Sequence, residues 1–369
     1  MSVLLGAAIL WLVVACAYRA VAFSSLSRMC DESDREHSGG RVPGAVVALR
    51  PLRGAGTQLE SCLDSLWRAS KTGDLRVVVG IAERTDPAFP VVSRVAERWP
   101  ETPCRVAVGA GPPGLNRKVS NQIQATRGER ADFWILSDAD VRVPDDYAER
   151  ILRPFADPAV GLTTCPYMSV PARSVVSRID ALVTNTHFVA NACLAARFEG
   201  VHFGLGATLA VRGTALEEIG GFESLLPLAA DDYWLARKVE DAGFRLAWVP
   251  MVVEHVLEEE GLRSVLARHV RWMRVTRASR PVGYAGSIVT HDLLPALVTA
   301  GLLAVSGGPA WLPIGAWWAL RATELWRRRD LVRFRAGDLW LLPLVDLTAL
   351  GVFVAGLFGS ARPPRGHVP

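Results

Sequence analysis

Two aspartates stand one residue apart directly after an apolar run. In FWILSDADV, Asp138 and Asp140 follow residues 133–137, which have the composition of a buried strand. Because side chains at i and i+2 of an extended chain point the same way, both carboxylates can converge on one point. Carboxylate oxygens are preferred ligands of Mg²⁺ and Mn²⁺, so we predict a divalent metal site here. The alternative is that the pair only ends a strand ahead of a helix starting in VPDDYAER.

A second acidic pair, Asp231 and Asp232, opens the helical pattern DDYWLARKVEDAG. Acidic residues are favourable at a helix N-terminus, so the pair is also typical of a plain helix start. One carboxylate can cap the helix while the other faces a ligand. No residue stands out as a covalent nucleophile, so the sequence favours a reaction without a covalent enzyme intermediate.

Side chains suited to an anionic ligand stand in two further segments. In NRKVSNQ, Lys118 could bind phosphates and Asn121 a sugar or ribose hydroxyl, although a solvated helix start is the alternative. Arg268, Arg271 and Trp272 lie in the helical stretch ARHVRWMRVTRASR, where Arg271 could reach a diphosphate. The same stretch is also typical of an interfacial helix whose arginines bind lipid headgroups.

The pattern of secondary structure indicates which fold positions these residues. Apolar β-rich runs alternate with helical patterns between residues 45 and 140. Such alternation predicts an α/β domain with a mostly parallel sheet and crossover helices. Ligands of these sheets bind beyond the carboxyl ends of the strands, where Glu83, Asp86 and the Asp138 and Asp140 pair fall. No G-x-G-x-x-G or G-x-x-x-x-G-K-[ST] motif occurs, so metal and basic side chains would have to hold any phosphates.

The composition favours a globular domain joined to membrane segments. The chain has 369 residues, of which 50% are hydrophobic, and a mean hydropathy of +0.22. Its 41 basic and 37 acidic residues leave a net charge of +4, too small a bias to predict nucleic-acid binding. Six cysteines without C-x-x-C spacing argue against a zinc site or a disulfide framework and favour reduced thiols.

Hydropathy divides the chain into membrane and globular parts. We predict an N-terminal anchor over 1–23, a membrane hairpin over 286–326 turning near Ser306, and a C-terminal span over 339–359. Both hairpin members are short, so one could be re-entrant or interfacial. Asp346 within the last span is expected to face a neighbouring helix. Between these segments we expect a linker (24–44), a globular domain including interfacial helices (45–285) and a basic loop (327–338).

Arginines between the last two spans set the predicted orientation. RATELWRRRDLVRFRAGD, residues 321–338, carries six of them, so the positive-inside rule places this segment and the globular domain in the cytoplasm. His187 lies in the apolar stretch VTNTHFVANACLAA. It is a candidate acceptor contact, although a lone histidine there is more often structural.

Several motifs in order carry a family resemblance. The chain resembles the family 2 glycosyltransferases, in particular the ceramide glucosyltransferase branch, through RPLRG, TDPAF, GLNRKVSNQ, SDADVRV, LAADDYWLARKV and RHVRW. Within that branch it is similar to the bacterial hopanoid-biosynthesis glycosyltransferases through NRKVSN, GATLAVR, GGFE and RPVGYAGSIVTH. The resemblance covers nearly the whole chain.

This resemblance implies a GT-A-type nucleotide-sugar-binding domain in a bacterial inner membrane. The implied reaction is inverting transfer of one GlcNAc or glucose from a UDP-sugar to a lipid hydroxyl, with a hopanoid polyol as the first acceptor. The alternatives are a glucosyltransferase acting on ceramide or another lipid, a polysaccharide synthase, and an inactive membrane scaffold or sugar-lipid carrier. Only three spans after the domain, and the presence of every motif acid, disfavour the last two.

The resemblance also implies residue roles. It matches Asp86, or Glu83 nearer the strand end, to nucleotide binding, and Asp138 to the D-x-D motif. It matches Asp232 to the catalytic base, and it matches the [QR]-x-x-R-W motif to Arg268, Arg271 and Trp272. Ceramide glucosyltransferases often lack the second D-x-D acid, whereas Asp140 completes it here. This departure favours dependence on Mg²⁺ or Mn²⁺ and disfavours a ceramide acceptor.

Overall fold

The computed structural model describes residues 2–31, 42–70 and 75–360, and the chain divides into two compact units. The sheet unit comprises residues 29–167 and 195–258. The helical unit comprises residues 1–28, 168–194 and 259–369. Strand β7 (Tyr167–Val170) and helix α7 (Val189–Phe198) lie where the chain passes from one unit to the other.

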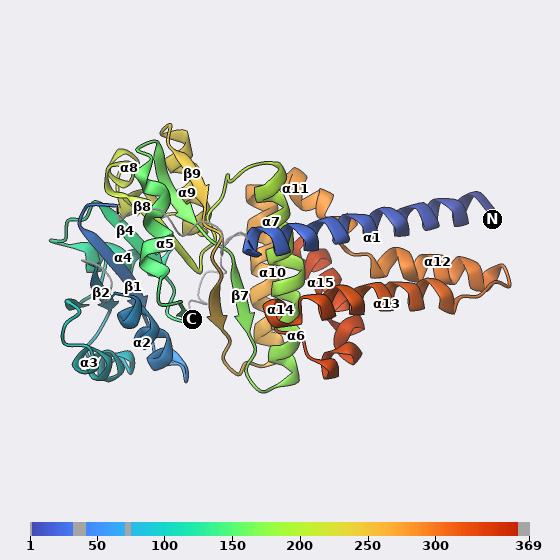
Figure 1. Cartoon of the computed structure of the whole chain (residues 1–369), viewed down its shortest axis with the longest axis horizontal. Coiled ribbons are helices and arrows are strands. Elements are labelled where there is room, and N and C mark those ends of the chain that lie inside the picture. The colour runs from blue at the N-terminus through green and yellow to red at the C-terminus, as the bar shows by residue number, and fades with distance from the viewer. Residues whose placement is uncertain (1, 32–41, 71–74, 361–369) are drawn as a thin grey trace. The chain divides into compact units, whose positions relative to one another are not determined.

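The sheet unit contains a seven-stranded sheet in the order β3-β2-β1-β4-β8-β6-β9. Strands β1, β2, β4, β8 and β9 of this sheet are labelled in Figure 1. Neighbouring strands from β3 to β4 are parallel, β8 runs antiparallel to β4 and β6, and β9 is parallel to β6. The mostly parallel sheet predicted from the sequence is therefore confirmed. The strands are β1 (Val46–Leu52), β2 (Leu75–Ile81), β3 (Cys104–Val108), β4 (Phe133–Ser137), β6 (Val160–Thr164), β8 (Thr208–Arg212) and β9 (Arg245–Trp248).

Helices connect and cover these strands. The principal ones are α2 (Leu59–Ser70), α3 (Ala88–Arg98), α4 (Arg117–Thr126), α5 (Tyr147–Leu152), α8 (Gly213–Glu218) and α9 (Asp231–Asp241). Short 3₁₀ segments occupy Arg153–Ala156 and Phe222–Leu225. A buried core joins the sheet to α4, α8 and α9 through Val119, Leu136, Leu209, Leu216 and Leu235. Burial of these apolar side chains fixes where α4 and α9 begin relative to the strand ends.

Chain segments distant in sequence meet at one edge of the sheet. Ser137, the last residue of β4, pairs with Thr208, the first residue of β8. The short strand β5 (Val141–Arg142) pairs antiparallel with β10 (Val253–Val256), with Val141 opposite His255. The turn carrying Asp138 and Asp140 is consequently held between two paired segments, at the carboxyl end of β4 as predicted.

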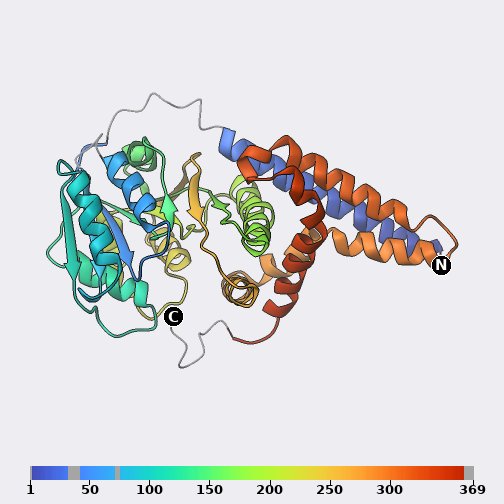
Figure 2. The ribbon, with the colours of Figure 1, turned by 90° about the horizontal axis from the view of Figure 1, so that it is seen from below.

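The helical unit contains the long apolar helices. Helices α1, α12 and α13 lie side by side (Figures 1 and 2). The unit's helices are α1 (Ser2–Asp31), α6 (Val175–Val183), α10 (Leu262–Ser279), α11 (Pro281–Gly286), α12 (Leu293–Val305), α13 (Trp311–Arg327), α14 (Arg329–Val332) and α15 (Leu342–Gly356), with a π-helical turn at Thr184–Phe188 and 3₁₀ turns at Ser287–Thr290 and Ala336–Leu341.

Among the residues that the structure describes, two helices are long and apolar enough to cross a membrane, Ser2–Cys30 and Ala336–Gly356. The segments Pro281–Thr290 and Leu293–Val305 meet at a 49° bend. If they form one continuous span, it is the third candidate among the described residues. Helix α1 continues beyond residue 23, the predicted end of the anchor, to Asp31. Most of the predicted linker, residues 32–41, lies outside the described residues.

A buried ionic cluster joins the helices of this unit. It consists of Arg19 on α1, His187 on the π-helical turn, Asp292 before α12, Arg321 on α13 and Asp346 on α15. Asp346 accepts hydrogen bonds from Arg19 at 3.1 Å, Arg321 at 3.2 Å and the His187 ring at 2.8 Å, while Arg19 also pairs closely with Asp292. As predicted, Asp346 faces neighbouring helices. Arg321, which the sequence grouped with the basic loop, is buried in this cluster because Asp346 compensates its charge.

Replacing Asp346 with Asn is expected to destabilise the helical unit. The change leaves the guanidinium groups of Arg19 and Arg321 buried without their shared counter-charge, which typically costs several kcal/mol. The apparent Tm of the full chain in detergent, followed by tryptophan fluorescence, should fall by about 5 °C or more. The exposed Asp330→Asn serves as the control and should leave the Tm unchanged. An unchanged Tm for Asp346→Asn would contradict the importance of this cluster.

Candidate active site

The ammonium group of Lys118 joins three segments of the sheet unit. Its Nζ lies 2.7 Å from Asp138 Oδ1 and 3.3 Å from Asp231 Oδ2. Lys118 is in the first turn of α4, Asp138 follows β4, and Asp231 begins α9. Asn116 caps α4 by accepting a hydrogen bond from the Val119 backbone, and its Nδ2 donates to Asp231 at 3.0 Å. One lysine and one asparagine thus hold the starts of α4 and α9 at the end of β4.

The two D-x-D carboxylates have different surroundings. Asp138 contacts Lys118, whereas Asp140 lies 3.4 Å from the Nε2 atom of His255 on β10. Their side chains remain 37% and 48% exposed, so both keep oxygen atoms accessible to a ligand. Beneath them Arg50 is fully buried and donates to Cys62 O at 3.0 Å and Ser137 Oγ at 2.9 Å. This buried positive charge favours the ionised form of the carboxylates above it.

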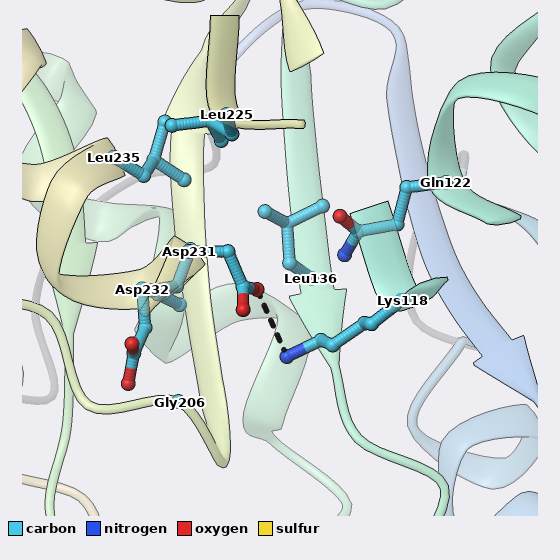
Figure 3. A pocket seen from close by; sticks show the side chains of 9 residues that line it. Lys118, Gln122, Leu136, Gly206, Leu225, Asp231, Asp232 and Leu235 are labelled. Carbon is cyan, nitrogen blue, oxygen red and sulfur yellow. Dashed lines mark ion pairs between the residues drawn. The ribbon is translucent and has the colours of Figure 1, made fainter. Parts of the chain in front are cut away.

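Asp232 follows Asp231 at the start of α9, but its side chain points away from Lys118 (Figure 3). The loop before β8 approaches it closely, since a Cβ added at Gly206 would lie 2.6 Å from Asp232 Oδ2. A Cβ at Gly204 would lie 2.9 Å from the Asp232 carbonyl oxygen. Glycine is therefore needed at 204 and 206, because the carbonyl oxygen and the carboxylate of Asp232 occupy the space that side chains would need.

A small recess, partly open to solvent, lies among these residues (Figure 3). Four leucines form its apolar lining, and Lys118, Gln122, Asp231 and Asp232 supply its polar groups. The leucines are Leu136, Leu209, Leu225 and Leu235. Such a mixture suits a ligand that carries both hydroxyl groups and C–H surfaces.

Burial and neighbouring charges shift the pKa values of Asp231 and Asp232 in opposite directions. Burial, together with the neighbouring Asp231 carboxylate, raises the pKa of Asp232 to about 6. Burial would also raise the pKa of Asp231, but the charge of Lys118 and the Asn116 hydrogen bond hold it below the ordinary value. Of two adjacent acids, Asp231 stays ionised and Asp232 can exchange a proton near neutral pH, which suits a general base.

The pKa values of Asp138 and Asp140 are also shifted in opposite directions. Burial raises the pKa of Asp138 despite the charge of Lys118. Loss of solvation acts in the same direction on Asp140, but the hydrogen bond and charge of His255, together with the charge of Arg50, outweigh it and lower the pKa. Burial disfavours the charged form of Lys118, yet Asp138 and Asp231 raise its pKa so that it stays an ammonium group.

The structure tests whether these residues suit a divalent cation. No group of three or more His, Cys, Asp or Glu side chains that could hold a metal occurs among residues 2–31, 42–70 and 75–360. Asp138 and Asp140 nevertheless provide two accessible carboxylates, and Mg²⁺ is commonly bound by one or two carboxylates together with substrate phosphates. The pair therefore fits a metal whose coordination a bound diphosphate completes.

The other predicted binding residues of the sheet unit are tied to the backbone. Asn121 Nδ2 donates to the carbonyl oxygens of Leu52 at 3.3 Å and Gly80 at 3.1 Å. Asp86 accepts from the backbone N–H groups of Gly54 and Ala88 at 2.9 and 2.8 Å. Both side chains thereby shape the loops that follow β1 and β2. Glu83 is exposed and its carboxylate contacts only the Thr85 hydroxyl among the described contacts.

The predicted Arg268, Arg271 and Trp272 all lie on α10 of the helical unit. Arg268 donates to Asp180 and Glu260 and lies over the Trp272 ring at 5.9 Å. Arg271 is exposed and makes no ion pair with the described residues. Within this unit Arg268 is thus a structural ion-pair partner, and Arg271 has its guanidinium available for a ligand.

His187, the predicted acceptor contact, is only 8% exposed and belongs to the ionic cluster. Its Nε2 lies 2.8 Å from Asp346, and its ring stacks on His291 at 5.8 Å. A lipid acceptor would therefore contact His187 only after displacing part of that cluster.

Four residues of the site had no role in the sequence analysis: Arg50, Asn116, Gln122 and His255. Asn116 carries a recognisable signal, because an asparagine before a helical pattern is a common N-cap. Arg50 lies inside an apolar strand, where a charged residue is unusual and a hidden partner can be suspected. Gln122 stands four residues after Lys118, a spacing that places both on one helix face. His255 carries no such signal, since only the fold brings it to Asp140.

The geometry can be compared with known proteins. Over 94% of this chain and 99% of the other, the fold matches a mannosyltransferase from Pyrobaculum calidifontis solved in complex with GDP-Man and Mn²⁺, with a TM-score of 0.55 and 18% identity. The chain is 23% identical over 271 residues to ceramide glucosyltransferase 1 of Caenorhabditis elegans, a match covering 72% of this chain and 56% of that protein. The chain thus spans a little over half the length of that relative.

The sheet unit and its acidic edge define an α/β fold of the GT-A-like class, with long apolar helices toward both ends of the chain. Residues 7–368 match the model of glycosyl transferase family 21, and the chain belongs to that family. The ceramide glucosyltransferase-like character inferred from the motifs is confirmed, and the family in which it falls is family 21.

Replacing Asp232 with Asn is expected to stabilise the protein near neutral pH. The unfolded carboxyl ionises near its ordinary pKa of about 3.9, whereas the folded carboxyl ionises at about 6. Ionisation therefore lowers stability progressively from pH 4 to 6, and the full cost remains above pH 6. At pH 7.5 the variant should gain about 1–2 kcal/mol, a gain that shrinks toward pH 4.

Thermal denaturation at both pH values measures this effect. Asp241→Asn, an exposed substitution at the end of the same helix, is the matched control and should show no such pH-dependent gain. A variant no more stable than wild type at pH 7.5 would contradict the raised pKa of Asp232.

Proposed function

We propose that the protein is a membrane glycosyltransferase that transfers one sugar, glucose or GlcNAc, from a UDP-sugar to a lipid hydroxyl with inversion of the anomeric carbon. The arrangement of Asp232 carries this proposal. A carboxyl with a pKa of about 6 lines a recess that also contains the ammonium group of Lys118 and lies beside the D-x-D pair. This combines a proton acceptor with groups that bind an anionic leaving group.

In the proposed reaction, the oxygen of the acceptor hydroxyl forms a bond to the anomeric carbon. Asp232 accepts the proton of that hydroxyl as the bond forms. The bond between that carbon and the diphosphate oxygen breaks, and the nucleoside diphosphate leaves with the electron pair. Lys118, 2.7 Å from Asp138, is placed to bind phosphate oxygens beside the D-x-D turn. A single displacement of this kind inverts the anomeric carbon.

Asp138 and Asp140 would hold a divalent cation, Mg²⁺ or Mn²⁺. When bound, such a cation neutralises the charge that develops on the diphosphate. His255 keeps the Asp140 carboxylate ionised and oriented through its 3.4 Å contact. Asp86, Glu83 and Asn121 remain proposed donor-binding residues at the ends of β1 and β2, acting mainly through the loops that they shape.

A lipid acceptor is supported by the apolar helices and by the similarity to a ceramide glucosyltransferase. The basic segment after α13 supports an orientation with the sheet unit in the cytosol, and the motif resemblance implies a bacterial cytoplasmic membrane. Motif similarity favours a hopanoid polyol as the acceptor, and the Caenorhabditis relative favours ceramide as the second candidate. Exposed Arg271 and neighbouring Trp272 are proposed to act near the membrane surface, where they could bind the diphosphate or lipid headgroups.

Transfer by the purified chain in detergent is the direct test. Labelled UDP-glucose and UDP-GlcNAc are offered separately with bacteriohopanetetrol and with ceramide in the presence of Mn²⁺. We expect a labelled glycolipid from wild type and a decrease in kcat of about 10²- to 10⁴-fold for Asp232→Asn, because the base is lost. Asp241→Asn should retain wild-type activity.

The results of this transfer assay distinguish the candidate acceptors and test the role of Asp232. Labelled hopanoid or labelled ceramide identifies the acceptor class. Full activity of Asp232→Asn would contradict its role as the base. Bound UDP-sugar without transfer to any lipid would favour the inactive scaffold.

The metal requirement gives an independent prediction. EDTA should abolish transfer, and Mn²⁺ or Mg²⁺ should restore it. Asp140→Asn should raise the Mn²⁺ concentration needed for half-maximal activity by about tenfold, because one carboxylate ligand is lost. Asp145→Asn, in the exposed turn after β5, is the control and should behave as wild type. Activity that is insensitive to EDTA would contradict the proposed cation site.

A further inference from the structure

Gln122 carries the most unusual polar group of the recess. Gln122 is 1% exposed, yet its Nε2 atom donates no hydrogen bond to any residue that the structure describes. Buried donors normally find a partner, because an unsatisfied one forfeits its hydrogen bonds to water without replacement. A buried donor without such a partner at the wall of a recess is explained if a ligand supplies the acceptor.

The fold aims this amide into the recess. Gln122 stands four residues after Lys118 on α4, so both side chains lie on one face of the helix. Figure 3 shows the amide of Gln122 and the ammonium group of Lys118 both directed toward the recess. Asn121 next to it is bonded to the carbonyl oxygens of Leu52 and Gly80, which fixes this turn of α4 against the strands.

The rest of the lining defines what such a ligand must offer. The recess provides apolar leucine surface around the amide, and its carboxylates lie on α9 across from α4. A group that fits has C–H surface for the leucines and an oxygen that accepts from the amide. A hexose ring has both, since its hydroxyls or an N-acyl carbonyl oxygen accept hydrogen bonds.

The neighbours of Gln122 indicate which part of the donor lies there. Lys118 and Asp232 both line the recess, and on the proposed function they act on the diphosphate and on the acceptor hydroxyl. The group bonded to the diphosphate and attacked by the hydroxyl is the sugar. We propose that Gln122 is a donor-specificity residue, whose amide donates a hydrogen bond to an oxygen substituent of the transferred sugar; this inference rests on the proposed function.

The proposal predicts that loss of the Gln122 amide weakens the binding of UDP-sugars but not the binding of UDP. The full chain in detergent with Mn²⁺ is titrated by calorimetry with UDP, UDP-glucose, UDP-galactose and UDP-GlcNAc. Gln122→Leu, similar in volume but without the amide, should weaken binding of the preferred UDP-sugar by about tenfold and leave UDP within about twofold of wild type. The differences among the three UDP-sugars should shrink in the variant.

Gln124→Leu is the matched control. Gln124 lies on the same helix and is 9% exposed, and its Oε1 also lacks a hydrogen bond, but it packs beside Gly109 and does not line the recess. It should leave the affinities for all four nucleotides unchanged. Thermal denaturation of both variants shows whether either change acts through folding.

Several results would overturn the inference. Gln122→Leu could retain the affinity and the order of the three UDP-sugars, or it could weaken UDP as much as it weakens the sugars. Failure of wild type to bind any UDP-sugar would overturn both the inference and the proposed function. Binding that depends on Gln122 without transfer to any lipid would contradict the proposed transfer alone, and transfer with unchanged donor preference in Gln122→Leu would contradict the inference alone.

Discussion

The ion pairs of Lys118 are the interaction on which the candidate active site depends. One ammonium group holds the carboxylates of Asp138 and Asp231, and therefore the end of β4 and the start of α9. Without it, two acids would face each other across a partly buried recess and repel. With Asp231 kept ionised in this way, its negative charge and burial together make the adjacent Asp232 a weaker acid. The same contact thus positions the site and sets its protonation.

The sheet makes this contact possible. Parallel strands bring their carboxyl ends to one edge, and the antiparallel strand β8 begins at that edge opposite the end of β4. The buried leucines of β4, β8 and α9 fix the distances between these elements. Glycines at 204 and 206 leave space for Asp232 where the chain turns into β8. The apolar core therefore supports the charged and polar groups of the site, and some of its leucines also line the recess.

In the helical unit, charged side chains are buried away from water. Asp346 receives hydrogen bonds from Arg19, Arg321 and His187, which come from three other segments of that unit. Each charge is costly to bury alone, and together they compensate one another. The cluster therefore favours one arrangement of α1, α13 and α15 over others that apolar contacts alone would allow.

The sequence by itself determined the periodic features: the alternation of strands and helices, the apolar helices, and the position of Asp138, Asp140 and Asp232 at element ends. These follow from local pattern, because strand and helix periodicity and capping are properties of neighbouring residues. Motif order also determined the family-level interpretation. Only the tertiary structure decided that Lys118 joins Asp138 to Asp231, that Gln122 faces the recess, and that His187 is buried against Asp346. Those contacts link residues up to 159 positions apart, and their burial, charge compensation and pKa values depend on packing that no local pattern encodes.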